Sequence, residues 1–202
     1  VALISDAGTP LISDPGYRLV KDVRDAGHEI FSVPGASSPI AALSIAGFPS
    51  DRFLFAGFLP PKSAARQTAL SELVDIPVTL VLFESPKRLT GLLKDIEAVM
   101  PDREAAVCRE MTKAFEEVLV GAPAELIETI DANATARGEI VVLINPPAAR
   151  EKMSESEVRE SLGVAMKSQP LKTAAARVAA LSGWSKRDVY QLALTFSYEE
   201  NE

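Results

Sequence analysis

Small polar residues, glycine and proline crowd one stretch near the start of the chain. Residues 5–16 are Ser-Asp-Ala-Gly-Thr-Pro-Leu-Ile-Ser-Asp-Pro-Gly, directly after the apolar run 1–4. Glycine lets backbone N–H groups approach a ligand closely, and the prolines fix φ and stiffen the loop. A rigid polar loop after a buried strand is where open α/β sheets bind ligands. Simple capping of a strand-to-helix connection is the alternative. It accounts for Asp14-Pro15-Gly16, but it leaves Asp6-Ala7-Gly8-Thr9-Pro10 unexplained.

A second group of reactive side chains follows the strand predicted over residues 104–111. Arg109, Glu110, Lys113 and Glu117 place carboxylates and cations within nine positions of one another. A carboxylate or a neutral lysine can accept a proton, and an arginine can bind phosphate. We name these four as candidate catalytic residues. A salt-bridge set at a strand end is the competing interpretation, and both stay open.

Two reactive residue types each occur once. The single histidine is His28, which excludes a histidine-based triad or metal cluster and predicts no metal site. The single cysteine, Cys108, ends an apolar run, so we predict a packed core thiol rather than a nucleophile. One cysteine also allows no internal disulfide, which fits a reducing compartment.

Composition is that of a globular protein. The chain has 202 residues, 47% hydrophobic and 24% charged, and a net charge of −7. An acidic chain does not coat nucleic acid over its whole surface, although a local basic patch is still possible. No apolar run is long enough to span a bilayer and no signal peptide opens the chain, so we predict a cytoplasmic protein.

The elements that would position these residues follow an α/β pattern. In the first part we predict strands at 1–4 and 29–33 around a helix at 17–26, then a helix at 40–46 with Ser38 as N-cap and Pro39 as its first residue. In the second part we predict strands at 53–59, 78–83, 104–111, 116–120 and 138–144, and helices at 64–73, after Ser85-Pro86, and at 123–130.

The last third of the chain is predicted to be helical. After a linker at 147–151, Ser154 and Glu157 match a capping box that opens a helix to about residue 167. Helices at 171–182 and 185–194, joined by Gly183, have the outline of a helix-turn-helix. Four cations accompany one acid there, namely Lys172, Arg177, Lys186, Arg187 and Asp188. Nucleic-acid contact and a dimerisation or packing role both remain open. The predicted division is an N-terminal α/β domain at 1–50, a second α/β domain at 51–147, and a helical segment at 148–202.

Several ordered motifs resemble one family. The stretch 5–16 is similar to the signature loop of the tetrapyrrole methylase superfamily, in the branch that methylates a cytidine ribose 2′-hydroxyl in small-subunit ribosomal RNA. The further matches are residues 34–38, 46–53, 83–88, 108–113 with Glu116 or Glu117, and Gly138-Glu139. The resemblance covers essentially the whole chain.

The resemblance implies two α/β domains with S-adenosylmethionine bound in the cleft between them, followed by the helical segment. It places the Asp6–Pro10 loop and Ile12 on the methionine side, Ser37 and Ser38 on polar groups, and other residues around the adenosine. The cofactor residues implied are Asp6, Ala7, Gly8, Thr9, Pro10, Ile12, Ser37, Ser38, Phe83, Met111 and Glu139. The resemblance also implies a homodimer.

The implied reaction is methyl transfer to a ribose hydroxyl of ribosomal RNA or of the assembled small subunit. We expect Glu110 or Lys113 nearest to the hydroxyl and Arg109 on phosphate. Further RNA contacts are expected at Lys87, Arg88, Lys172, Lys186 and Arg187. The family's first strand and glycine-containing loop are not found before Val1, so we expect a preceding segment and an incomplete site in this chain. Methylation of a small molecule or of a protein side chain, and a non-catalytic RNA-binding role, remain alternatives.

Overall fold

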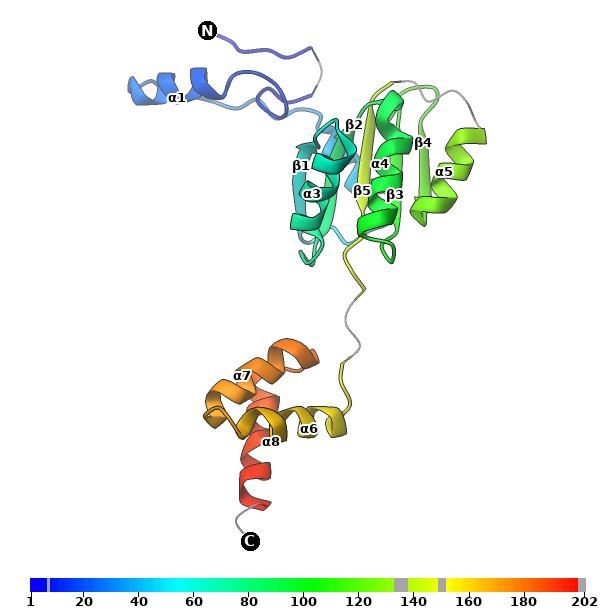
Figure 1. Ribbon diagram of the computed structural model, residues 1–202. Coiled ribbons are helices and arrows are strands. Elements are labelled where there is room, and N and C mark those ends of the chain that lie inside the picture. Colours follow the sequence, from blue (N-terminus) through cyan, green and yellow to red (C-terminus); the bar gives the residue numbers. More distant parts are fainter. Residues whose placement is uncertain (7, 133–137, 149–151, 200–202) are drawn as a thin grey trace. The chain divides into compact units, whose positions relative to one another are not determined.

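The computed structural model describes residues 1–6, 8–132, 138–148 and 152–199. The chain divides into two compact units, residues 1–148 and residues 149–202 (Figure 1). The first is a mixed α/β unit and the second is helical, as the sequence predicts. The predicted boundary at residue 50, inside the first unit, stays a prediction.

One five-stranded sheet forms the centre of the first unit. Its strands are β1 (Phe53–Phe58), β2 (Thr79–Glu84), β3 (Ala105–Arg109), β4 (Glu117–Gly121) and β5 (Ile140–Ile144), in the order β1-β2-β5-β3-β4. β1 and β2 are parallel, whereas β5 is antiparallel to both β2 and β3. β3 and β4 form the antiparallel hairpin that the sequence predicts. All five β5 residues are buried, which explains why that strand is continuously apolar.

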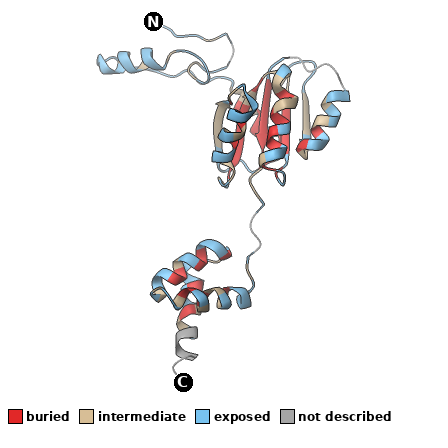
Figure 2. Ribbon diagram, viewed as in Figure 1, coloured by how far each residue is buried: buried red, intermediate tan, exposed pale blue. Residues whose placement is uncertain are grey.

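Helices cover both faces of this sheet. α3 (Ser63–Leu73), α4 (Pro86–Val99) and α5 (Pro123–Ala132) lie along one face and enclose the larger core (Figures 1 and 2). α2 (Ser38–Ile45) packs on the other face against a smaller core that includes Cys108. Cys108 is fully buried, and burial, assisted by the charge of Glu116, raises the pKa of its thiol to about 11. The predicted core role of Cys108 is confirmed.

The two strands predicted in the first 36 residues are wrong. Residues 1–4 and 29–33 are not strands in this structure, and they flank α1 (Tyr17–Asp25), which has no buried residue. An apolar run becomes a strand only where neighbours accept its main-chain hydrogen bonds. Two parallel strands with one helix are too few for independent stability, since three or more strands with a covered face are needed. The predicted helix itself is confirmed.

The predicted N-cap of α2 is wrong by one residue. Ser37 occupies the N-cap position, Ser38 begins the helix, and Pro39 lies one position further in. Both serines precede the proline and have the same capping chemistry, so local sequence does not separate them. Ser85 and Pro86 do occupy the predicted N-cap and first position of α4.

The second unit consists of three helices. They are α6 (Glu155–Met166), α7 (Leu171–Ser182) and α8 (Lys186–Glu199). The predicted capping box is present, since Ser154 and Glu157 exchange side-chain to backbone hydrogen bonds. Gly183 adopts the left-handed conformation that ends α7. Trp184 donates its Nε1–H to the carbonyl of Met153 at 2.6 Å, which fixes the turn to the segment before α6.

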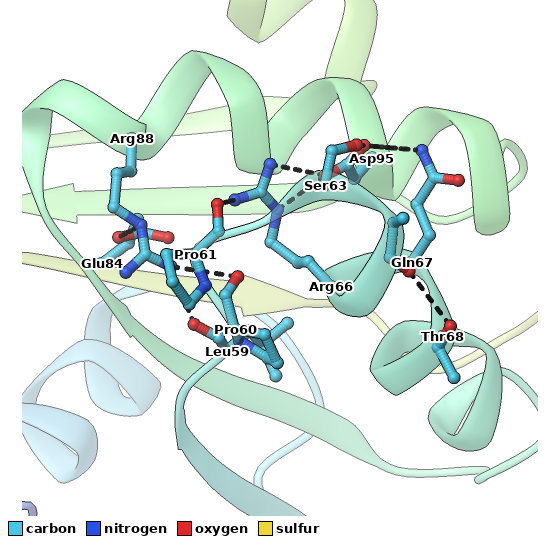
Figure 3. Close-up of polar contacts among 11 residues, drawn as sticks. Leu59, Pro60, Pro61, Ser63, Arg66, Gln67, Thr68, Glu84, Arg88 and Asp95 are labelled. Carbon is cyan, nitrogen blue, oxygen red and sulfur yellow. Dashed lines mark hydrogen bonds and ion pairs between the residues drawn. The ribbon is translucent and has the colours of Figure 1, made fainter.

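Two arginines hold the loop that leaves β1 (Figure 3). Arg66 donates to Asp95 from Nε at 2.6 Å and to the Pro61 carbonyl at 3.3 Å. Arg88 faces Glu84 at 3.1 Å and donates to the Leu59 carbonyl at 2.8 Å. Both carboxylates are buried. The main chain around Pro60-Pro61 is therefore held by cations whose own positions are set by α4 and β2.

The Asp95 carboxylate is buried but well bonded. Burial alone raises its pKa, but hydrogen bonds from Gln67, Ser63 and Arg66, with the Arg66 charge, outweigh burial and leave the pKa below its ordinary value. Such a group stabilises the fold above the unfolded-state pKa of about 3.9. That contribution is lost as the pH falls through the folded-state pKa.

None of the helices in the described parts of the chain is long and apolar enough to cross a membrane.

Replacing Asp95 by Asn should destabilise the sheet unit by about 3 kcal/mol at pH 7, because the change leaves the Arg66 charge buried without its partner. The difference from wild type should begin to shrink below about pH 4, where Asp95 of the unfolded chain takes up a proton, and it should vanish as the pH falls through the lower folded-state pKa. Native-state hydrogen exchange of the β2 amides at pH 7 and pH 3 measures both.

Asp25→Asn is the matched control, because Asp25 pairs with Lys21 on the exposed surface of α1. Equal protection factors in the Asp95 variant and wild type at pH 7 would contradict a stabilising role for the buried pair.

Candidate functional site

The strand register brings the predicted site residues of the sheet to one end. Phe58 pairs with Phe83, Glu84 with Ile140, and Arg109 with both Ile140 and Glu117. The carboxyl ends of β1, β2 and β3 therefore lie beside the amino ends of β4 and β5. We call this end of the sheet the strand-end site; its residues are Phe58, Phe83, Glu84, Arg109, Glu110, Met111, Glu117 and Glu139.

An aromatic cluster forms the apolar part of the strand-end site. The Phe83 ring lies 4.9 Å from that of Phe55 and 5.4 Å from that of Phe58, measured between ring centroids. Phe83 and Met111 are half-buried and pack against the α2-side core. Phe58 is 57% exposed, so one ring of the cluster is accessible. Sequence reasoning missed Phe58, although its place at the end of a predicted strand was a signal.

The four candidate catalytic residues form two separate ion pairs. Arg109 Nε lies 2.5 Å from Glu117 Oε2, and the pair lines a small cavity with Leu89, Leu119 and Ile130, on the face covered by α4 and α5. Lys113 Nζ lies 3.0 Å from Glu110 Oε1 beyond the end of β3. Phe83 and Met111 lie toward the opposite, α2-covered face. The Arg109–Glu117 contact and the Glu110–Lys113 contact are thus two different ion pairs.

The turn after β3 has an unusual backbone. Glu110 and Thr112 adopt positive φ angles of 49° and 66°. For residues with a side chain this region costs about 1–2 kcal/mol each. The Thr112 N–H donates to the Glu116 carboxylate, and the Lys113 N–H donates to the Glu110 carbonyl at 3.0 Å. These contacts hold a strained turn in place, and such turns cluster at functional sites.

Gly138 leaves room for the side chain of Glu110. A Cβ atom at Gly138 would lie 1.6 Å from Glu110 Oε1, and the φ of Gly138 is +82°. The Glu110 N–H also donates to the Glu139 carbonyl at 3.3 Å. The glycine therefore allows the Glu110 carboxylate to lie across the start of β5. Gly138 was not among the site residues predicted from the sequence, although it precedes Glu139 in the Gly138-Glu139 motif.

The polar loop near the start of the chain is tied to two other elements. The Thr9 hydroxyl donates to the Ala36 carbonyl at 3.3 Å, just before α2. Ser13 Oγ lies 3.4 Å from the point where a Cβ on Gly57 of β1 would be. The loop thus reaches both the start of α2 and the end of β1.

The cofactor residues predicted in this part differ in exposure. Asp6, Gly8, Thr9 and Ile12 are exposed, whereas Pro10, Ser37 and Ser38 are partly buried. Ala7 lies outside the described residues. Glu139, directly before β5, is exposed.

The predicted RNA contacts lie in two places. Arg88 is engaged with Glu84 and with two main-chain carbonyls of the β1 loop, so a phosphate would compete with those bonds (Figure 3). Its neighbour Lys87 is exposed. Lys172, Lys186 and Arg187 line one groove between α7 and α8 of the second unit. In the described parts of the chain, no three His, Cys, Asp or Glu side chains are placed to hold a metal ion.

Comparison with known families matches both units. Residues 1–127 match the family described as Tetrapyrrole (Corrin/Porphyrin) Methylases, and residues 152–197 match the family described as RsmI C-terminal HTH domain. A solved structure of the methyltransferase CobJ has a similar fold, with a TM-score of 0.52 and 19% identity over 73% of this chain and 64% of that one. Cobalt precorrin-4 methyltransferase CbiF has a TM-score of 0.50 and 17% identity over 68% and 61%. At this identity the likeness concerns the fold alone.

Curated relatives are much more similar in sequence. A protein of Mesorhizobium japonicum named Ribosomal RNA small subunit methyltransferase I is 46% identical over 95% of this chain and 65% of its own length. The protein of the same name from Escherichia coli O157:H7 is 42% identical over 96% and 68%. The chain therefore spans about two thirds of the length of these relatives.

Gly138→Ala should destabilise the sheet unit by about 1–2 kcal/mol, because a residue with a Cβ is strained at positive φ and the new methyl displaces Glu110. Hydrogen exchange of the β5 amides measures the loss. Gly35→Ala is the control, since Gly35 has an ordinary φ and open space around its Cβ position. Equal losses in the two variants would show that the conformation of Gly138 is not special.

Proposed function

The chain belongs to the tetrapyrrole methylase family, and from this premise we propose that it serves S-adenosylmethionine-dependent methylation of small-subunit ribosomal RNA. The acceptor we propose is the ribose 2′-hydroxyl of a cytidine. The names of the curated relatives support a ribosomal RNA substrate. The choice of atom and nucleotide rests on the resemblance of the sequence motifs to one branch of the family.

The residues of the strand-end site fit the chemistry of the cofactor. An adenine ring packs on apolar and aromatic side chains, and Phe83 with its neighbours Phe55 and Phe58 supplies such side chains at the same core as Met111. The amino-acid part of the cofactor needs backbone and short polar groups. The loop at Asp6–Pro10 carries them and is linked by Thr9 to the segment before Ser37 and Ser38. We propose these residues, with Ile12 and Glu139, as the cofactor contacts.

When bound, the cofactor supplies a methyl group on a sulfonium, which an oxygen nucleophile can take by in-line displacement. The part left to the protein is to hold the hydroxyl in line and to accept its proton. Glu110 is the better acceptor of its pair, because an ionised carboxylate accepts hydrogen bonds, whereas the ammonium of Lys113 only donates them. Lys113, 3.0 Å away, then keeps the carboxylate in position. We propose that Arg109 and Glu117 form a supporting ion pair. Arg109 can contact an RNA phosphate if the phosphate replaces Glu117 as its partner.

RNA contact requires local positive charge in a chain of net charge −7. We propose Lys87 near the strand-end site and the cations of the α7/α8 groove as phosphate contacts. Arg88 is a weaker candidate because it holds the β1 loop. A homodimer, and a cytoplasmic location where ribosomal RNA is found, complete the proposal.

The observation that carries the proposal is that the aromatic cluster and the Glu110–Lys113 pair both lie at the same end of the sheet. Glu110→Gln should lower the rate of methyl transfer to small ribosomal subunits about 10²- to 10⁴-fold, because the amide cannot accept the proton. The affinity for S-adenosylmethionine should stay unchanged. Transfer of a radiolabelled methyl group and calorimetric titration of the cofactor measure the two quantities.

Glu128→Gln on the exposed surface of α5 is the control for the loss of one carboxylate. The relative from Escherichia coli O157:H7 calibrates the assay, with free RNA and a tetrapyrrole as competing acceptors. Methylation of the tetrapyrrole alone would overturn the RNA proposal, and an unchanged rate in Glu110→Gln would remove Glu110 from the mechanism.

A further inference from the structure

The second unit contains a groove between α7 and α8 of about 480 Å³. We call it the α7/α8 groove; its lining consists of Lys172, Ala175, Ala176, Lys186, Arg187, Tyr190 and Gln191. This volume lies within the range of about 300–1,000 Å³ that is typical of small-ligand sites. The two helices are neighbours joined by the Gly183 turn (Figure 1). The groove is therefore a feature of this unit alone.

Helix spacing places the functional groups on facing sides. On α8, Tyr190 follows Lys186 by four positions and Gln191 follows Arg187 by four, so each pair shares a face. On α7, Lys172 precedes the two small residues Ala175 and Ala176 by about one helical turn. Behind the groove lies a core that includes Ala175, Val178 and Val189. Lys172, Lys186 and Arg187 are exposed and are not part of that core.

Tyr190 is a partly accessible aromatic residue that is not part of the helical core. Its side chain belongs to the groove lining and the residue is 39% exposed, whereas the neighbouring Trp184 is fixed by its bond to Met153. The ring stands one helical turn from Lys186 and Arg187, and Gln191 follows it directly on α8.

The charged residues that line the α7/α8 groove are all positive. Three cations and no carboxylate occur among its lining residues, in a chain whose net charge is −7. Asp188 lies on the same helix, but it is absent from the lining, and its N–H is bonded to Ser185. The groove therefore selects an anion, and it has room for a flat group beside that anion.

We propose that the α7/α8 groove binds one unpaired nucleotide of RNA, with the base stacked on Tyr190 and the flanking phosphates held by Lys172, Lys186 and Arg187. Gln191 supplies a donor and an acceptor for the edge of the base. The proposal rests on the proposed function, which makes RNA the polyanion. It adds that the helical unit recognises a single-stranded segment of the substrate through a base as well as through phosphates.

An unpaired base fits the groove better than a duplex does. The major groove of an RNA helix is deep and too narrow for side chains to reach the bases, so a helix pair laid on a duplex would use charge alone. An exposed tyrosine beside cations is instead the usual combination for single strands, where rings stack on aromatic side chains.

The test measures binding of the whole chain to a fluorescent oligocytidylate of about 12 nucleotides, to the same strand paired in a duplex, and to a version in which one internal base is missing. Tyr190→Ala should weaken binding to the single strand about 5- to 100-fold, the range of one lost stack. Tyr190→Phe should restore it. The alanine variant should bind the duplex like wild type and should keep the slope of log affinity against log salt.

Lys186→Gln is the matched charge variant. It should weaken single strand and duplex alike and reduce the salt slope by about one. Oligoadenylate and oligouridylate in place of oligocytidylate test Gln191, whose change to Ala should lessen any preference among the three.

The outcomes separate this inference from the proposed function. Equal affinities of wild type and Tyr190→Ala for the single strand, or an equal loss on the duplex, would overturn the nucleotide site while leaving RNA methylation intact. Failure of the wild-type chain to bind either RNA would count against both the groove and the RNA contacts in the proposed function. Loss of methyl transfer by Glu110→Gln with normal RNA binding would leave the groove standing.

Discussion

The double pairing of β5 is the constraint on which the first unit depends. Ile140–Ile144 is the last strand of the sheet in the chain, yet it lies between β2 and β3 and is hydrogen-bonded to both. All five of its side chains are buried, and each large apolar side chain contributes about 1.5–3 kcal/mol when buried. Without β5 the β1–β2 pair and the β3–β4 hairpin would be separate two-stranded pieces, which are marginal in water.

The same pairing decides where chemistry is possible. Because β5 runs antiparallel to its neighbours, its first residue lies beside the last residues of β2 and β3. The turn after β3 then lies against Gly138, two residues before β5, and the Glu110 carboxylate occupies the space that a side chain at Gly138 would fill. On the α2 side the register places Phe58 beside Phe83, so the aromatic cluster forms next to that turn. Register alone thus brings together residues separated by up to about eighty positions.

The sequence predicted the sheet unit well wherever local signals and burial agree. β-branched runs such as residues 78–83 and capping residues such as Ser154 fall where the structure has strands and helix starts. It did not predict how the four candidate catalytic residues would divide into two ion pairs, since the pairing depends on which face each side chain of β3 reaches and on a positive φ at Glu110. It predicted strands at 1–4 and 29–33 from apolarity alone, and apolarity does not specify a pairing partner. Phe58 and Gly138 were missed because their importance arises from contacts across strands.

The central claim is that the cofactor binds at the strand-end site. The most direct measurement is a map of backbone amide chemical shifts of the chain as S-adenosylhomocysteine is added. We predict that the shifts gather at Phe58, Phe83, Met111 and Glu139, and in the loop around Thr9. Shifts confined to the opposite end of the sheet, at Thr79, Arg103 and Asn145, would contradict the account.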